Sequence, residues 1–243
     1  MKTFLFLSST FLLLALIGKQ TAAQDSISFP NRKLYIAIMV SPDLGYLDAS
    51  SIEQFKIDCT AGINVGYQLK ESIAIETGLL YYDKGYSTGW DEYYYFDPLD
   101  APNVPPYNTY TPNTTIPDYY KVNYHFKYIG IPVNAIYQSG KLKWKFVANF
   151  GGSVDFLIST KYAFILEFEN GNKEKVTAKP AGDYNPINVS LFAGIGVAYK
   201  LTKFSSISMI PTYNYGLLKI DDSNNPLRLQ NTGLKVKYSY AIK

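Results

Sequence analysis

The stretch Phe55–Leu69, FKIDCTAGINVGYQL, decides the fold class of this chain. Its odd-numbered positions are all apolar, and its even-numbered positions are all polar or glycine. Because successive side chains of a β-strand point to opposite faces, the stretch predicts a ribbon with one apolar and one polar face. Strands of globular proteins usually run for about five or six residues. This alternation is much longer than that. The apolar face of the strand therefore packs either against a protein core or against membrane lipid.

Seven further stretches carry the pattern of a strand. They are Lys33–Pro42, Ser72–Gly85, Tyr120–Gln138, Leu142–Ile158, Ile187–Lys200, Phe204–Leu218 and Leu229–Lys243. Along Tyr120–Gln138 the apolar residues move from even positions, Val122, Tyr124 and Phe126, to odd positions that begin at Ile129. A β-bulge near Tyr128 would bring both halves onto one face.

The connections between the eight expected strands alternate in length. The long ones are 43–54, 86–119, 161–186 and 219–228, and the short ones are 70–71, 139–141 and 201–203. The segment 161–186 is expected to be a protruding hairpin that reverses at Asn170-Gly171. Soluble sandwiches mix loop lengths without such order, whereas outer-membrane barrels keep short turns on the periplasmic side and longer loops outside the cell. The order therefore predicts an all-β fold, an eight-stranded antiparallel up-and-down transmembrane β-barrel.

In such a barrel the polar faces line the interior and bring charged residues together. The residues expected there are Lys56, Asp58, Glu76, Lys143, Lys145, Asp155, Lys235 and Lys237. Eight strands enclose a space just wide enough to be filled by side chains, and burying an unpaired charge costs several kcal/mol. We therefore expect a network of paired charges, with glycines on the same faces giving it room. A lipocalin-like soluble barrel would have the reverse arrangement, an apolar cavity and a polar exterior.

The N-terminus has the pattern of a secretory signal peptide. Lys2 is followed by an apolar run from Phe4 to Ile17 and by small residues that end at Ala23. The run is shorter than the roughly 20 residues of a transmembrane helix. We expect cleavage after Ala23, with a retained N-terminal anchor as the alternative. Residues 24–243 then form a single outer-membrane β-barrel domain.

Composition excludes several classes of function. The whole chain has 23 Lys and Arg against 20 Asp and Glu, and loss of residues 1–23 brings the net charge close to zero, so a nucleic-acid partner is not expected. The single cysteine, Cys59, cannot form an internal disulfide. The sequence has neither a His and Cys cluster with metal-ligand spacing nor a glycine-rich phosphate loop, so it predicts no cofactor.

Two features at the expected outer end of the barrel, one in a long connection and one near the end of a strand, suggest chemistry. An aromatic group with Trp90, Tyr93, Tyr94, Tyr95 and Phe96 offers a recognition patch for a protein or a carbohydrate. The same rings would also serve to fold the loop over the barrel mouth, and the sequence does not choose between the two. The single histidine, His125, follows Asp118 closely and is a candidate for rim catalysis, although a lone histidine is more often a hydrogen-bonded strand residue.

Three segments resemble a known family. Lys127–Gln138, KYIGIPVNAIYQ, has an aromatic residue, an Ile-Pro pair and an alternating run to a terminal Tyr; SGKLKWKFVANFGGSVDFLIS follows it, and ETGLLYYDKGY precedes it at Glu76–Tyr86. Together they resemble the outer-membrane β-barrel domain family that includes PorT-like proteins, over essentially the whole mature chain. The resemblance implies an eight-stranded barrel of a Bacteroidetes-type bacterium, related in architecture to OmpA and OmpX. The family has no catalytic residues to carry over, and PorT itself belongs to a protein-secretion and gliding apparatus.

From these observations we expect a non-enzymatic protein of the outer membrane, with a structural or interaction role through long extracellular loops. The expected neighbours are outer-membrane lipid and lipopolysaccharide, and the protein is expected to be a monomer. The alternative is a component of a protein-secretion or transport assembly, with other envelope or secretion proteins as partners. The third hypothesis, less favoured, is an outer-rim enzyme that uses His125.

Overall fold

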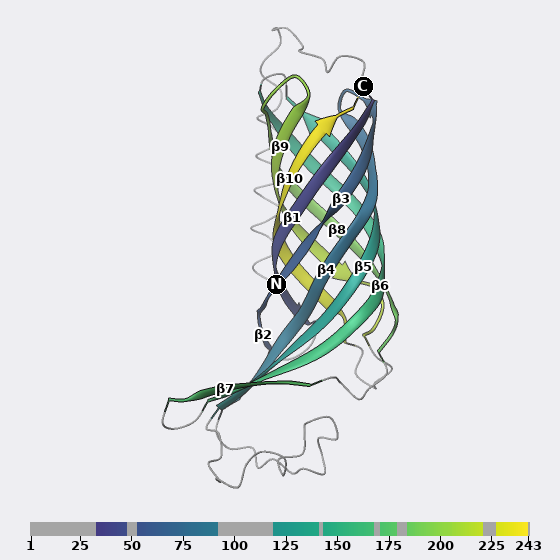
Figure 1. The fold of residues 1–243 in the computed structure, drawn as a ribbon. Helices are drawn as coiled ribbons and strands as arrows, with labels where there is room; N and C mark the ends of the chain where they lie inside the picture. The colour runs from purple at the N-terminus through teal and green to yellow at the C-terminus, as the bar shows by residue number, and fades with distance from the viewer. Residues whose placement is uncertain are drawn as a thin grey trace, which may run out of the picture.

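The computed structural model describes residues 33–47, 53–91, 119–140, 143–167, 171–178, 184–220 and 227–242. Within them the chain forms a ten-stranded sheet (Figure 1). The strands are β1 (Leu34–Leu47), β2 (Glu53–Gln54), β3 (Lys56–Lys70), β4 (Ile73–Asp91), β5 (Tyr119–Ser139), β6 (Trp144–Glu167), β7 (Lys173–Ala178), β8 (Ile187–Lys200), β9 (Ser205–Gly216) and β10 (Leu229–Ala241). The expected signal peptide, residues 1–23, lies outside the described residues.

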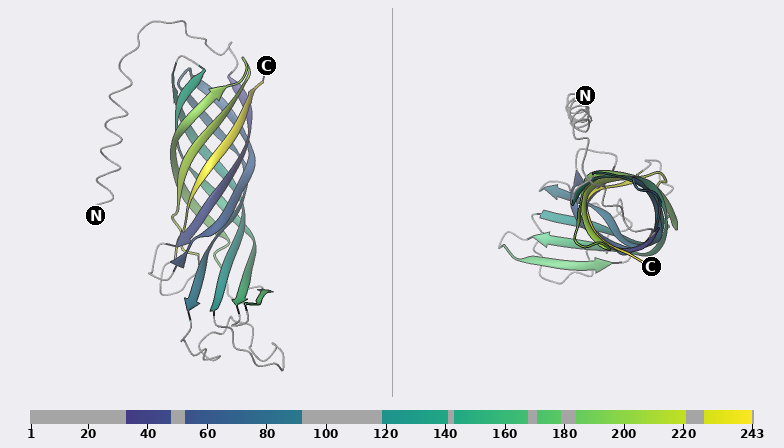
Figure 2. Two further views of the ribbon diagram at one scale, coloured as in Figure 1. Left: turned by 90° about the vertical axis from the view of Figure 1, so that its left-hand side faces the viewer. Right: turned by 90° about the horizontal axis from the view of Figure 1, so that it is seen from above.

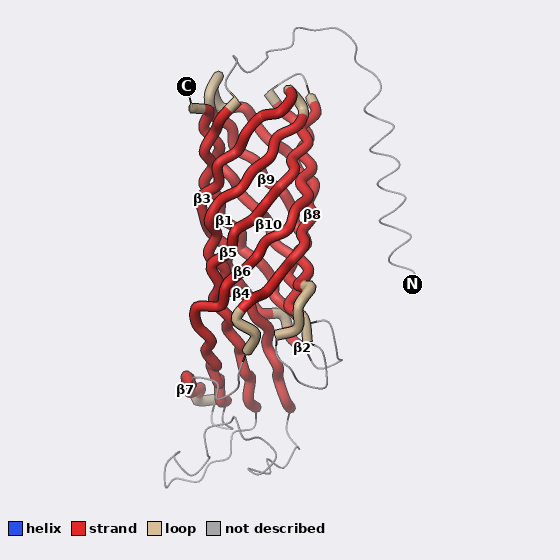
Figure 3. The backbone as a smooth tube through the Cα atoms, turned by 90° about the vertical axis from the view of Figure 1, so that its right-hand side faces the viewer, coloured by secondary structure: helices blue, strands red, loops and turns tan. Residues whose placement is uncertain are grey.

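All of these strands except β2 and β7 close into a ring. The order around it is β4-β3-β1-β10-β9-β8-β6-β5, and β5 pairs with β4 to complete the circle. Every pair is antiparallel. Neighbours in the ring also follow each other along the chain among these eight strands, except for β1 and β10, the first and the last of them. Seen along its axis the molecule is a closed tube (Figure 2, right), and its strands run obliquely round it (Figure 3). The predicted eight-stranded antiparallel up-and-down barrel is confirmed.

The barrel wall has an apolar outer face and a largely polar inner face, because each strand alternates as its sequence does. In β3, Ile57 is 81% exposed whereas its neighbour Asp58 is 4% exposed. The outward apolar set continues round the ring and includes Ile38, Ile63, Leu79, Val133, Phe150, Leu191, Met209 and Leu234. A soluble monomer rarely exposes a continuous apolar patch of more than a few hundred Å². The apolar face of Phe55–Leu69 therefore looks away from the protein, as expected.

The barrel has two different ends, because short and long connections alternate as expected. The turns from β3 to β4, from β5 to β6 and from β8 to β9 are short, and the start of β1 lies beside the end of β10, where Tyr35 pairs with Ala241. These turns and chain ends form the short-turn end of the barrel. The opposite end carries the long connections, and we call it the long-loop end.

At the long-loop end three strands continue beyond the ring. Within the ring, the pairing of β3 with β4 reaches Cys59 and Asp83, and that of β6 with β8 reaches Phe156 and Ile187. Past these points β4, β5 and β6 stay paired with one another, and β7 adds to β6 (Figure 2, left). This projecting sheet is made of Gly85–Asp91, Tyr119–His125, Lys161–Glu167 and β7.

Two segments expected to be loops are strands. Asp43–Leu47 pairs with β10, and Tyr86–Asp91 pairs with β5. The loop prediction is wrong at these places, because paired neighbours extend the ladder past the point where the sequence stops alternating. The ends of long strands were thus harder to predict than their centres.

The expected protruding hairpin is present. β6 reverses into β7, with Glu167 opposite Lys173, and Gly171 takes a φ of 77°. This left-handed conformation favours glycine, which pays no steric cost for it. Asn170, the other residue expected in this turn, lies outside the described residues.

A β-bulge lies close to the expected place, but on the neighbouring strand. Tyr128 pairs with Leu157 and Lys127 pairs with Ser159, so Ile158 is the extra residue. The bulge therefore belongs to β6 and places two residues, Ile158 and Ser159, opposite Lys127 of β5.

The apolar residues in the outer half of β5 lie on the inner face of the sheet, and not on the outward face as expected. Val122 and Phe126 are buried and Tyr124 is half-buried. Val122 packs with Tyr162 and Phe164 of β6, and Tyr124 packs against the same group. The expectation that a bulge turns these three residues to the outward face is wrong, because beyond the ring the inner face of the projecting sheet has an apolar core of its own.

Apolar side chains pack the lumen on either side of its polar residues. Toward the short-turn end the buried group is Ala74, Ile136, Val147, Ala198 and Ile210. Toward the long-loop end the larger group is Met39, Leu80, Tyr82, Tyr86, Phe126, Tyr128, Ile220 and Leu229. Eight strands enclose little more space than such side chains occupy. The interior is therefore a core rather than an open pore.

Candidate functional site

The lumen charge network is the set of buried ionic residues inside the barrel. Its members are Asp43, Lys56, Asp58, Glu76, Lys84, Asp155, Lys235 and Lys237. Lysines and carboxylates are equal in number within this set, so the buried charge balances. Six of the members form three direct ion pairs: two join different strands, and the third, between Lys56 and Asp58, lies within β3 beside the ladder break described below.

Glu76 of β4 receives two donors in the half of the lumen that is nearer the short-turn end. Lys237 Nζ of β10 lies 2.5 Å from its Oε1, and Tyr35 of β1 donates its hydroxyl to the same oxygen at 2.8 Å. Lys237 and Glu76 are 5% and 1% exposed, so neither charge is screened by water. The pair ties β4 to β10 across the interior.

Asp155 of β6 is the most completely buried charge. Its Oδ2 accepts from Lys84 Nζ at 2.8 Å, from Asn188 Nδ2 at 3.2 Å and from the Ser190 hydroxyl at 3.3 Å. Gly130 lies directly beside it, and a Cβ atom there would come within 2.3 Å of Asp155 Oδ1. The glycine therefore makes room for the carboxylate, as the sequence analysis proposed for the glycines of this face in general.

Lys56 and Asp58 form an ion pair at a break in the barrel ladder. The pairing of β3 with β4 stops at Cys59 and resumes only in β2. In this gap the N–H of Gly85 donates to Asp58 Oδ2 at 2.8 Å, so the carboxylate takes the place of a ladder acceptor. Lys56 Nζ also lies 3.4 Å from Asp83 Oδ1. The break is therefore closed by charged side chains.

Lys235 and Asp43 complete the charge balance without touching. Both line a cavity of about 30 Å³, which has room for roughly two water molecules. The Lys235 ammonium lies 4.8 Å from the ring centre of Phe192. Asp43 accepts from the hydroxyls of Ser41 at 2.5 Å and Thr60 at 2.6 Å. A cavity of this size does not form a passage through the barrel.

The structure places most, but not all, of the expected lumen residues in this network. Lys143 is exposed at the short-turn end, outside β6, so its expected lumen position is wrong. Lys145 is half-buried near the same end. Asp43 was not among the expected lumen residues, because it falls in a segment expected to be a loop. Lys84 was not among them either, although strict alternation from Glu76 along β4 places it on the same face.

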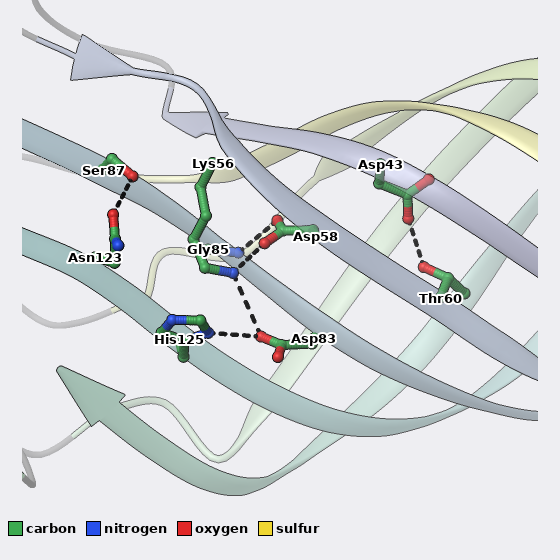
Figure 4. A network of polar contacts seen from close by, with 9 residues as sticks. All are labelled: Asp43, Lys56, Asp58, Thr60, Asp83, Gly85, Ser87, Asn123 and His125. Carbon is green, nitrogen blue, oxygen red and sulfur yellow. Dashed lines mark hydrogen bonds and ion pairs between the residues drawn. The ribbon is translucent and has the colours of Figure 1, made fainter. Parts of the chain in front are cut away.

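His125 lies on the outward face of β5, where the ring ends and the projecting sheet begins. Its Nδ1 is 3.1 Å from Asp83 Oδ1 (Figure 4). The side chains of His125 and Asp83 are 29% and 25% exposed. Asp83 thus joins His125 to Lys56 (Figure 4). Asp118, the partner suggested by the sequence, lies outside the described residues.

The described part of the chain contains neither a candidate metal site nor a membrane-spanning helix. No group of three or more His, Cys, Asp or Glu residues there is arranged to hold a metal ion. No helix within the same ranges is long and apolar enough to cross a membrane.

The sequence from 36 to 222 matches the family model described as outer membrane protein beta-barrel domain. The chain belongs to this family. The match covers most of the barrel and agrees with the continuous apolar outer face, so the barrel crosses the outer membrane and its exposed apolar residues face lipid. Outer-membrane barrels keep their short turns on the periplasmic side, and by this rule we assign the short-turn end to the periplasm and the long-loop end, with the projecting sheet, to the outside of the cell.

Comparison with individual proteins adds little to the family match. No curated protein sequence matches the chain. Neisserial surface protein A has a TM-score of 0.49 and 12% identity, with 86% of this chain and 97% of that chain covered. Ail of Yersinia pestis has a TM-score of 0.40 and 12% identity (87% and 100% covered), and the protease OmpT of Escherichia coli has 0.33 and 10% (92% and 99%). Likeness at this level carries no argument about what this outer-membrane barrel does.

The expected aromatic recognition patch of the barrel falls mostly on residues that are not described. Trp90 is in β4, and its backbone pairs with Tyr120 of β5. Tyr93, Tyr94, Tyr95 and Phe96 lie outside the described residues. The patch therefore begins at the extracellular tip of the projecting sheet, and whether it binds a partner or caps the barrel stays a prediction.

Proposed function

We propose that the protein is a non-enzymatic interaction protein of the outer membrane that works through its extracellular end. The observation that carries this proposal is the filled lumen combined with the projecting sheet. Three ion pairs and two apolar groups occupy the interior, while β4, β5, β6 and β7 continue past the ring as the projecting sheet. A barrel wall that is packed inside and extended outside is suited to presenting a surface rather than to passing solutes.

The absence of a pore is tested by conductance. The purified, refolded protein in a planar lipid bilayer is expected to give no stable single-channel steps, because the lumen of an eight-stranded barrel is filled by side chains. A known porin reconstituted under the same conditions serves as the positive control. Reproducible steps of uniform size from the purified protein would contradict the proposal.

The interaction role is tested by photo-cross-linking in cells. A photoreactive residue at Tyr94, in the long connection beyond Trp90, is expected to give a discrete cross-linked product. The same residue at Trp144, an exposed position near the periplasmic short-turn end, is the control and is expected to give none of that product. Cross-linking equal at both positions, or absent at Tyr94, would count against an extracellular interaction surface.

A role in a protein-secretion assembly like that of PorT is the second candidate. It rests on the Ile131-Pro132 pair and the glycine placements, and both belong to the barrel wall: Ile131 is exposed on the outside and Pro132 is buried inside. Residues of the barrel wall affect how the barrel packs, and they do not indicate which partner the protein binds. Retention of secreted proteins in cells that lack this chain would favour the secretion role, and normal secretion would exclude it.

An enzymatic role for His125 has less support. A histidine that catalyses hydrolysis deprotonates a hydroxyl, a thiol or a water molecule. Among the described residues the hydrogen-bond partner of His125 is Asp83, and Asp83 also contacts Lys56. Because these contacts join β5, β4 and β3, the proposed role of His125 is to hold the rim together where the ladder between β3 and β4 is broken.

A further inference from the structure

The apolar band of the barrel ends sharply on the side formed by β4, β5 and β6. The continuous run of outward apolar residues on these strands ends at Tyr81, Ile129 and Ile158, all exposed. The next outward positions are polar, namely Asp83 on β4, Lys127 on β5 and Ser159 on β6. The change from apolar to polar residues marks the level at which the lipid tails end and the headgroups of the extracellular leaflet begin.

The β6 bulge gathers three hydrogen-bond donors at this level. Ser159 lies opposite Lys127 across the ladder, and Lys161 lies two residues further along β6, opposite His125. Side chains diagonal to each other on one face of a sheet are about 7–8 Å apart at the backbone, within the reach of two lysines that converge on one ligand. Lys161 is exposed, and Lys127 and Ser159 are half-buried.

The two lysines leave this surface positively charged. Neither Lys127 nor Lys161 forms an ion pair with any described residue. The carboxylate of Asp83 lies on the same face, directly opposite Lys127 across the ladder between β4 and β5, but it is bound by His125 and lies 3.4 Å from Lys56 Nζ. An anion held between Lys127 and Lys161 would therefore meet two ammonium groups and a hydroxyl without displacing a partner.

We propose that Lys127, Ser159 and Lys161 form a binding site for a phosphate group of lipopolysaccharide in the extracellular leaflet. The position commits the site to a lipid rather than to a free anion, because apolar residues that contact the lipid tails lie immediately beneath it. Lysine clusters beside a membrane-embedded segment bind anionic headgroups, and phosphate accepts charge-assisted hydrogen bonds from ammonium and hydroxyl groups. The proposal concerns the side of the barrel and does not depend on the role of the loops.

The test compares two double variants of the full-length protein in detergent, with fluorescent lipid A as the probe. Lys127→Gln with Lys161→Gln is expected to weaken binding about tenfold, a loss of about 1.4 kcal/mol. The matched control, Lys143→Gln with Lys203→Gln, removes the same charge from exposed positions at the short-turn end and is expected to bind like the unmodified protein. Heat-modifiable migration checks that each variant is folded, and Lys161→Gln alone is used if the double variant is not.

Two further arms identify the source of the phosphate. Lipid A from which the phosphates have been removed is expected to bind no more tightly to the unmodified protein than to the Lys127 and Lys161 variant. Inorganic phosphate at millimolar concentration is expected not to displace phosphorylated lipid A. Equal binding by both double variants, equal binding of dephosphorylated lipid A, or displacement by inorganic phosphate would each overturn the proposal.

Discussion

Replacing Asp155 with Leu is expected to lower the free energy of unfolding by about 3–5 kcal/mol. Asp155 is fully buried, and its Oδ2 lies 2.8 Å from Lys84 Nζ. Removing the carboxylate leaves the Lys84 ammonium inside the barrel without its counter-charge. Unfolding by urea in phospholipid vesicles, followed by tryptophan fluorescence and heat-modifiable migration, measures the loss.

The double variant Asp155→Leu with Lys84→Met is the control for this effect. Removing both charges together leaves no uncompensated ion, so the double variant is expected to be more stable than Asp155→Leu alone. The coupling between the two residues then follows from the double-mutant cycle. If the single and double variants lose the same stability, Lys84 and Asp155 do not act as a pair and the account of the lumen is wrong.

Replacing Ile63 with Arg is expected to destabilise the barrel by about 2–4 kcal/mol. Ile63 lies near the middle of the outward face of β3, opposite Leu79 of β4, and both are more than half exposed. In the outer membrane these positions contact the centre of the hydrocarbon region, where a guanidinium is poorly solvated. Urea titration of the refolded variant in vesicles measures the effect.

The matched control is Ile57→Arg on the same face of the same strand. Ile57 lies beyond Cys59, the last residue of β3 that pairs with β4, and so lies at the extracellular rim. Near the interface an arginine costs only about 0–1 kcal/mol, because it reaches water and headgroups. Equal costs at Ile57 and Ile63 would contradict the placement of the apolar band.

The fold was largely predictable from local alternation. Along Phe55–Leu69 the polarity of each residue predicts the face on which it lies. In the structure Ile57, Ile63 and Val65 are exposed on the outside, and Asp58 and Asn64 are buried inside. A strand has a side-chain period of two, so one correct face assignment determines the rest of the strand. The alternation of long and short connections then favoured a membrane barrel, whose apolar face contacts lipid, over a soluble fold with an apolar core.

The same reasoning failed where the environment changes along one strand. Val122, Tyr124 and Phe126 are as apolar as the lipid-facing residues of β5, yet they face inward. Apolar character states only that a side chain avoids water, and beyond the ring that requirement is met by a protein core with Tyr162. Nothing local in the sequence marks the residue at which the ring ends.

The ion pairs within the lumen could not be predicted from the sequence either. Alternation places Asp155 and Glu76 inside, but which lysine each one meets depends on strand register and on the curvature of the barrel. Lys84 and Lys237, which form those pairs, are 71 and 161 residues away from their partners in the chain. Lys143 has the right parity but lies just outside β6, so it is exposed instead.

The central claim, that the apolar face of β3 contacts lipid, is tested most directly by a nitroxide label at Ile63. The variant Cys59→Ser with Ile63→Cys is labelled and refolded into vesicles, and its collision rates with oxygen and with a water-soluble nickel chelate are measured. We expect frequent collisions with oxygen and few with nickel, the pattern of a side chain in hydrocarbon. Low collision rates with both, as in a protein core, or a high rate with nickel, as in water, would contradict the account.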